Sequence, residues 1–316
     1  MVSNFTLTNL ATEETLKFGQ EVGVDFLFQD GGIDWGSAPA SHNTYTYPGQ
    51  IGVSISSTNI REREITISGF AFYVVSNPER EGMTYEEYVK YGYEKILKKK
   101  DILNKIINPE DYVRITVGEY YIDGKPDSSV RFGDTEETNN QFFCKFFISI
   151  YCENPMFKKK TIMQTMLSGN IPKFHFPLVF TKEKGIVFGI RKKYRLIEVE
   201  NEGSIKIGAI VTFKSKGVVV NPAIENLQNG QRIVINKTLQ EGEEVVINTN
   251  DGPEKGIKGF VNGQELNYFK YWDFENNWMK FNPGTSLLGY SVQSENESLL
   301  EVYVELNPVK FGVEEM

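Results

Sequence analysis

The stretch GVVVNPAIENLQNGQRIVINKTLQEGEEVVIN, from Gly217 to Asn248, contains three short runs that are rich in β-branched residues. Turn-forming pairs separate these runs: Asn221-Pro222, Asn229-Gly230 and Glu241-Gly242. Short runs bounded by such pairs are typical of antiparallel strands and hairpins. The stretch holds no His, no Cys and no catalytic motif. It therefore predicts β structure and gives no indication of chemistry.

Turn signals continue at short intervals on both sides of this stretch. From residue 194 to the end they recur as Gly203, Gly208, Gly217, Asn229-Gly230, Glu241-Gly242, Asp251-Gly252, Asn262-Gly263 and Pro283-Gly284. Many short strands at such spacing are typical of a sandwich of two sheets. We expect residues 194–316 to form a C-terminal antiparallel β-sandwich.

The N-terminal part predicts a second β-rich domain, over residues 1–155. In REREITISGFAFYVV, Ile65 and Ile67 share one side of a strand, while Thr66 and Ser68 take the other. The stretch from Gly31 to Gly52 is rich in Gly, Ser, Pro and Asn, and predicts an extended loop. Residues 156–193, where the strand pattern weakens, are expected to form a junction between the two domains.

One long helix is predicted at about residues 84–107. Thr84 followed by Glu87 forms a capping box, and Asn108-Pro109 ends the helical pattern. Apolar or small residues then recur at spacings of three, four and seven, which predicts a single buried face. That face comprises Tyr85, Val89, Gly92, Ile96, Leu103 and Ile107. The fold class is therefore mainly β with one long helix.

Composition excludes several classes of function. The net charge of −8 argues against a nucleic-acid binder, which needs a basic face to replace phosphate counterions. The N-terminal residues do not resemble a signal peptide, and no apolar run approaches the roughly 20 residues of a membrane span. The two cysteines, Cys144 and Cys152, form no disulfide framework, and we expect them to be reduced and buried.

Motifs of catalysis or metal binding are absent from the sequence. His42 and His175 are far apart, and neither has a zinc-type spacing to another ligand. No G-x-S-x-G elbow or phosphate-binding loop occurs. We therefore predict no catalytic residues, no metal site, no cofactor and no enzymatic activity.

Aromatic residues concentrate between Leu266 and Gly284, and two interpretations are open. Flat rings beside Asp and Asn side chains can stack on a sugar ring and hydrogen-bond its hydroxyls. The same rings can instead fill the core of the sandwich. The candidate sugar or partner contacts are Tyr268, Tyr271, Trp272 and Trp278.

The order of these features resembles the distal tail proteins of long-tailed phages, the siphophage tail component family. In the first domain the resemblance rests on YPGQIG, REREITISGFAFY, the single helix and FISIYCENPMF. In the second it rests on VENEGS, NPAIENLQNGQRIVINKTLQEGEEVVINTNDG, VNGQE and WMKFNPGTSLLGYS. Similar proteins occur in contractile tails and in phage-tail-like bacteriocins.

The resemblance implies a structural protein of the virion tail tip or baseplate, made in the bacterial host cytoplasm. Its N-terminal domain would form a homohexameric ring, and its C-terminal domain would be galectin-like. The ring would join the tail tube protein to the baseplate hub, or tail-associated protein, and could carry receptor-binding or side proteins. The alternative is a carbohydrate-binding, host-recognition sandwich of a tail or cell-surface assembly.

A ring subunit needs surfaces that reach its neighbour. The long loop is a natural arm, and Trp35, Tyr45 and Tyr47 are of types enriched at interface cores. Arg61 and Arg63 either pair with a neighbouring subunit or lie on a solvated strand end. We expect these five residues at the inter-subunit interface.

Overall fold

A computed structural model describes residues 4–20, 24–73, 82–160, 163–166, 168–172, 189–193, 196–293 and 297–313. Within these ranges, side chains are described for all residues except 29–31 and those between 161 and 195. The chain divides into two compact units, of which the first comprises Met1–Lys160 and Lys310–Met316 and the second Thr161–Val309. The change of unit at Lys160 falls inside the segment expected as a junction. The return at Lys310 has no signal in the sequence.

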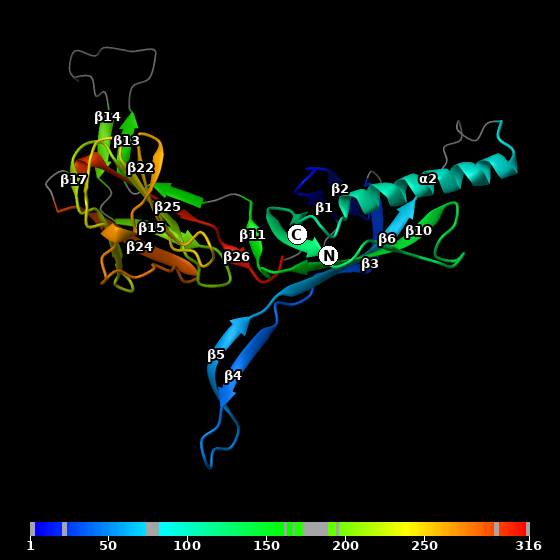
Figure 1. Cartoon of the computed structure of the whole chain (residues 1–316), viewed down its shortest axis with the longest axis horizontal. Coiled ribbons are helices and arrows are strands. Elements are labelled where there is room, and N and C mark those ends of the chain that lie inside the picture. The colour runs from blue at the N-terminus through cyan, green and yellow to red at the C-terminus, as the bar shows by residue number, and fades with distance from the viewer. Residues whose placement is uncertain are drawn as a thin grey trace, which may run out of the picture. The chain divides into compact units, whose positions relative to one another are not determined.

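The first unit is built on a sheet that closes into a barrel (Figure 1). Its order is β8-β7-β1-β2-β3-β6-β10, and a pairing between β10 and β8 closes the ring. The strands are β1 (Asn4–Asn9), β2 (Thr15–Gly19), β3 (Phe26–Asp34), β6 (Arg63–Phe72), β7 (Val113–Val117), β8 (Tyr120–Pro126) and β10 (Phe143–Cys152). Three short strands extend the sheet: β9 (Arg131–Phe132), β11 (Phe157–Lys159) and β26 (Val309–Lys310).

Alternating burial fills the interior of this barrel. Ile65 and Ile67 of β6 are fully buried, whereas Thr66 and Ser68 are half-buried, as the sequence pattern predicts. Stacked and edge-on phenyl rings fill the centre, at ring-centroid separations of 4.9–6.1 Å. These rings belong to Phe5, Phe18, Phe26 and Phe146. Both cysteines lie buried on β10, and burial raises the pKa of Cys152 to about 12.

Helix α2 (Tyr85–Ile106) begins at the predicted capping box. The Thr84 side chain accepts from the Glu87 amide, and the Glu87 carboxylate accepts from the Thr84 amide at 2.8 Å. The helix buries Gly92, Ile96, Leu103 and Ile106. The predicted burial of its first turns is wrong, because the N-terminal end extends past the barrel and Tyr85 is 78% exposed.

The loop expected between Gly31 and Gly52 is largely a hairpin. β4 (Ala40–Tyr45) pairs antiparallel with β5 (Ser54–Ile60), and Figure 1 shows this pair projecting from the barrel. Side-chain bonds link the two strands, including His42 to Thr58 at 2.9 Å and Asn43 to Ser57 at 2.8 Å. The composition of this segment is typical of a loop, so it did not predict the two strands, whose polar side chains hydrogen-bond to each other. We call residues 36–60 the arm.

The second unit contains two antiparallel sheets around one core, as predicted. The six-stranded sheet has the order β12 (Met163–Met166), β25 (Leu300–Leu306), β16 (Ile210–Ser215), β21 (Glu244–Asn248), β22 (Gly256–Val261), β23 (Gln264–Asn267). The four-stranded sheet has the order β15 (Leu196–Asn201), β24 (Gly284–Ser291), β18 (Ala223–Asn226), β19 (Gln231–Val234). Two short pairs complete the described strands: β13 (Ser168–Pro172) with β14 (Gly189–Lys193), and β17 (Val219–Val220) with β20 (Thr238–Leu239).

The opening stretch, Gly217 to Asn248, links these two sheets. Its Asn229-Gly230 pair turns β18 back onto β19, with Gly230 at a positive φ of 68°. Its Glu241-Gly242 pair instead sends the chain from β20 to β21, which pairs with β16 in the six-stranded sheet. Phe213, Ile247, Phe281 and other apolar residues of the core are fully buried. The fold class, mainly β with one long helix among the described residues, is confirmed.

Candidate interaction surfaces

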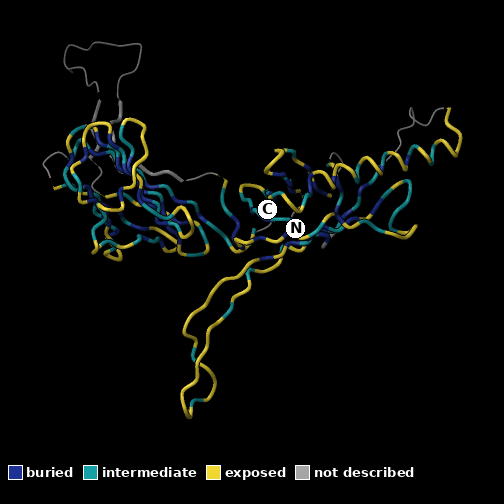
Figure 2. Tube along the Cα trace, viewed as in Figure 1, coloured by how far each residue is buried: buried dark blue, intermediate teal, exposed yellow. Residues whose placement is uncertain are grey.

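The tip of the arm exposes apolar side chains to solvent. Figure 2 shows almost the whole arm as exposed. Ile51 is fully exposed, and Tyr47 and Val53 are about 60% exposed. We call the arm tip the set Tyr45, Tyr47, Ile51, Val53 and Ile55. Contiguous exposed apolar side chains of this kind mark interaction sites more often than chance exposure does.

The arm also lacks charge. From Trp35 to Ile60 there is no Asp, Glu, Lys or Arg, although these residues make up 24% of the whole chain. Depletion of charge together with exposed aromatic and aliphatic residues is typical of the buried centre of a protein interface. This absence of charge was the signal in the sequence that points to the arm as a binding element.

The five predicted interface residues do not lie together. Tyr45 and Tyr47 are on the arm tip, where their rings meet edge-on at 5.1 Å. Trp35 instead packs inside the first unit, edge-on to Phe5 and Phe157 at 5.9 and 5.8 Å. Arg61 is exposed at the base of the arm.

Arg63 is 2% exposed and makes its contacts within the first unit. Its guanidinium lies 5.0 Å from the centre of the Phe157 ring and donates a hydrogen bond to the carbonyl of Phe311. Burial lowers the pKa of Arg63, and the neighbouring Cys152 thiol has the opposite, smaller effect. Arg63 thus holds both the segment that leaves the first unit and the segment that returns to it.

Sequence patterns alone missed a second exposed apolar surface, on α2. Tyr85, Val89, Tyr93 and Leu97 follow one another four residues apart, and we call them the helix stripe. They line a hollow of about 540 Å³ together with Glu86, Lys90 and Glu94. Leu97 is 55% and Tyr93 44% exposed. The spacing was visible in the sequence, but it predicted burial of Tyr85 and Val89 against the barrel.

The four candidate sugar contacts pack largely into the second unit. Tyr268 is 3% exposed, and its ring meets that of Tyr271 edge-on at 5.1 Å. Trp272 and Trp278 stack on each other at 4.6 Å and pack against the buried core. This arrangement favours the core interpretation of the cluster, because the ring faces are used within the chain. Phe269 and Phe274 of the same stretch are exposed.

A charged network holds Tyr268 in place. Its hydroxyl and the Lys237 ammonium both donate to the buried carboxylate of Glu243. The Gln240 amide donates to the same carboxylate at 3.0 Å. Burial by itself would raise the pKa of Glu243, but these donors lower it below its ordinary value. Burial and the Glu243 charge raise the pKa of Tyr268, so its hydroxyl stays protonated.

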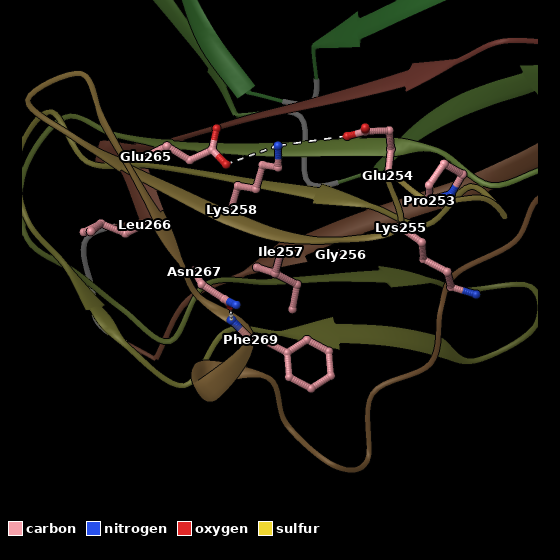
Figure 3. Close-up of a pocket in the computed structure, with 10 residues that line it drawn as sticks. All are labelled: Pro253, Glu254, Lys255, Gly256, Ile257, Lys258, Glu265, Leu266, Asn267 and Phe269. Carbon is pink, nitrogen blue, oxygen red and sulfur yellow. Dashed lines mark hydrogen bonds and ion pairs between the residues drawn. The ribbon is translucent and has the colours of Figure 1, made fainter.

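A shallow groove of about 500 Å³ lies between the turn at Pro253–Lys258 and strand β23 (Figure 3). Its charged residues are paired: the Lys258 ammonium lies 3.2 Å from the Glu265 carboxylate and 4.0 Å from that of Glu254. The Asn267 side-chain oxygen accepts a hydrogen bond from the Phe269 backbone amide at 2.9 Å. The groove is open and its polar groups already have partners, so its geometry favours no particular chemistry.

The described residues contain no group of three or more His, Cys, Asp or Glu that could hold a metal ion. His42 is exposed on the arm, and His175 lies outside the described residues. In the described part of the chain, no helix is both long and apolar enough to cross a membrane.

Comparison with known proteins gives one family match and several similar structures. Residues 202–303 match the model of the siphovirus-type tail component, C-terminal domain. The crystal structure of the phage protein SPP1 Dit (gp 19.1) superposes with a TM-score of 0.60, at 12% identity, over 96% of this chain and 98% of that one. A chain of the activated phage P2 baseplate with Ca gives a TM-score of 0.40, at 16% identity, over 96% and 98%. A search of curated sequences finds no match.

The family match covers much of the two-sheet unit, and the SPP1 Dit superposition extends over both units. Residues 202–303 are therefore similar to the C-terminal domain of the siphovirus-type tail component family, and the chain as a whole has the fold of SPP1 Dit.

Proposed function

We propose that this chain is a structural distal tail protein of a phage or phage-tail-like particle. It assembles at the tail tip as a homohexameric ring that joins the tail tube protein to the baseplate hub. SPP1 Dit, whose fold this chain shares, is described as a paradigm of the hub of the adsorption apparatus in phages that infect Gram-positive bacteria. The family match of residues 202–303 to a tail component supports the same role.

The observation that carries the ring proposal is the arm. An uncharged hairpin with a fully exposed Ile51 buries its apolar surface only when another molecule covers it. A projecting element that binds a different surface on an identical neighbour gives a head-to-tail contact, which closes into a ring when the rotation permits. The arm on each copy thus supports self-assembly.

The proposed role is structural and not catalytic. The buried carboxylate of Glu243 accepts hydrogen bonds from Lys237 and Tyr268 within the second unit, which supports a structural role for this charged group. In the assembled tip, the second unit would be available to carry receptor-binding or side proteins. Host-cell cytoplasm is the expected place of synthesis, before assembly into the particle.

Electron microscopy of the particle and light scattering of the pure chain test this proposal together. We expect a ring at the tail tip that binds antibody against this chain, and a solution mass of six times 36.1 kDa. A pure chain that stays at 36.1 kDa at every concentration, and is missing from tail tips, would overturn the proposal.

The alternative function, a saccharide-binding second unit, has less support, because the rings of Tyr268, Trp272 and Trp278 pack on one another or on the core. A glycan array with the full chain tests it. Binding that is lost in Trp272→Ala, with the fold retained, would favour the alternative.

A further inference from the structure

We infer that the arm tip of one copy binds the helix stripe of a neighbouring copy of this chain. This inference rests on the proposed ring and goes further, because it names the two surfaces that meet. The arm tip comprises Tyr45, Tyr47, Ile51, Val53 and Ile55, and the helix stripe Tyr85, Val89, Tyr93 and Leu97.

The arm has the length and the chemistry of a ligand for another copy. At about 3.3 Å per residue, the segment from Ala40 to Gly49 spans up to about 30 Å. The paired strands β4 and β5 and the side-chain bonds between them hold the arm extended before binding. A binding element that is ordered in advance loses less conformational entropy when it binds.

The helix stripe has the chemistry of a receptor for the arm tip. Its apolar side chains line a hollow of about 540 Å³, and the phenol groups of Tyr85 and Tyr93 add polar ends at its border. A tyrosine offers a large apolar ring and a hydroxyl that can hydrogen-bond, and it is enriched at interface cores. Ile51 and Val53 are aliphatic, and the arm around them is rich in Ser and Thr.

Charge argues for a second copy as the occupant. Two copies with a net charge of −8 each repel one another, so a self-contact is favoured where one side is uncharged. The arm has no charged residue, and the hollow is bordered by Glu86, Lys90 and Glu94, which carry both signs. Lys90 lies four residues from each of the two carboxylates, so the charged border of the hollow sums to −1. A neutral arm adds no like charge to this border.

The two surfaces do not meet within one copy. Figure 1 shows the arm projecting from the barrel on the side away from α2, and Figure 2 shows the arm and the N-terminal end of α2 as largely exposed. A contact between different surfaces of identical chains is head-to-tail, so each copy would give one arm and receive another.

The test uses one charge inserted into each surface of the full chain. Ile51→Asp alters the arm tip and Leu97→Glu alters the helix stripe; both residues are exposed, so the fold should be retained. Matched controls add a charge elsewhere on the same elements: Asn59→Asp at the base of the arm and Ile102→Glu on α2 outside the helix stripe. Light scattering over a range of concentrations then reports the assembled mass.

We expect the wild type and both controls to assemble, and each altered chain alone to need at least about tenfold higher concentration. An equal mixture of the two altered chains has one intact arm tip facing one intact helix stripe. It should form 1:1 dimers and nothing larger. This complementation would not occur if arms bound arms.

A second measurement, disulfide cross-linking, detects the contact even where the ring itself is unstable. Mixing Ile51→Cys with Tyr93→Cys should give a disulfide-linked heterodimer, since the native Cys144 and Cys152 are buried. Two results together would overturn the inference and leave the proposed ring standing. The first is that Leu97→Glu forms rings as well as the wild type does. The second is that Ile51→Cys and Tyr93→Cys do not cross-link. A wild-type chain that does not assemble, together with Ile51→Cys and Tyr93→Cys chains that do not cross-link, would overturn both.

Discussion

The arm tip and the aromatic cluster of the second unit, comprising Tyr268, Tyr271, Trp272 and Trp278, both contain tyrosines but differ in exposure. In both, the apolar residues are interleaved with polar ones. Tyr47 is 61% exposed, whereas Tyr268 is 3% exposed. One difference is a buried, charged partner: the Tyr268 hydroxyl donates to the Glu243 carboxylate, which also accepts from Lys237. An aromatic side chain is buried at low cost only where its polar end finds such a partner.

The largest expected effect tests the buried side of this comparison. Tyr268→Ala removes a buried ring and leaves a cavity, which should lower the free energy of unfolding of the second unit by about 3–5 kcal/mol. Two of the three tryptophans, Trp272 and Trp278, lie in the same unit, so their fluorescence follows its denaturation in urea. Tyr47→Ala on the arm is the control and should leave this transition in place. If both substitutions lowered the free energy of unfolding equally, the burial of Tyr268 would contribute nothing to the stability of the second unit.

A smaller loss is expected at Arg63, compared with Arg61. Arg63→Ala removes a buried hydrogen bond from a charged group and a contact with the Phe157 ring, so the first unit should lose about 2–3 kcal/mol. Arg61→Ala, two residues earlier and exposed, should change stability by less than about 0.5 kcal/mol. Thermal unfolding of both variants measures the difference. Equal losses of stability in the two variants would show that the contacts of Arg63 with Phe157 and Phe311 do not stabilise the first unit.

A pH-dependent loss is expected at Glu243. Glu243→Gln keeps the shape but removes the charge that accepts from Lys237 and Tyr268, which should cost about 1–2 kcal/mol at neutral pH. Because the pKa of Glu243 is lowered in the folded chain, its stabilisation is present above about pH 4.5. It is lost as the pH falls through the lowered value.

The difference between wild type and Glu243→Gln should therefore disappear in acid. Urea unfolding at several pH values measures it, with the exposed Glu241→Gln as the matched control. A difference that stays constant down to low pH would show that the charge of Glu243 contributes nothing and that only its shape matters.

Much of the fold follows from local signals in the sequence. The Thr84 capping box, the alternation of Ile65 and Ile67 with Thr66 and Ser68, and the Asn229-Gly230 hairpin all appear in the structure. Each of these depends on residues close together in the chain, so a pattern along the sequence is enough to predict it.

The rest depends on contacts between distant residues. Periodicity places Tyr85 on the same face as Ile96, but it cannot show that the barrel ends before the helix does. Composition marks residues 31–52 as loop-like, while pairing with β5 turns part of them into a strand. The partner of Tyr268 lies at Glu243, 25 positions away, and the contacts of Arg63 lie as far as Phe311. No local pattern predicts such partners.

The smallest expected effect tests the exposed side of the comparison. Ile51→Asp should change the free energy of unfolding of the unassembled chain by less than about 0.5 kcal/mol, because a fully exposed side chain has no contacts to lose on folding. Urea unfolding at concentrations below assembly measures this, and the same variant is expected to assemble poorly. A destabilisation similar to that of Tyr268→Ala would mean that the arm tip packs within its own chain. A surface that binds a partner is thus distinguished from a core by a substitution that impairs assembly strongly and changes folding stability little.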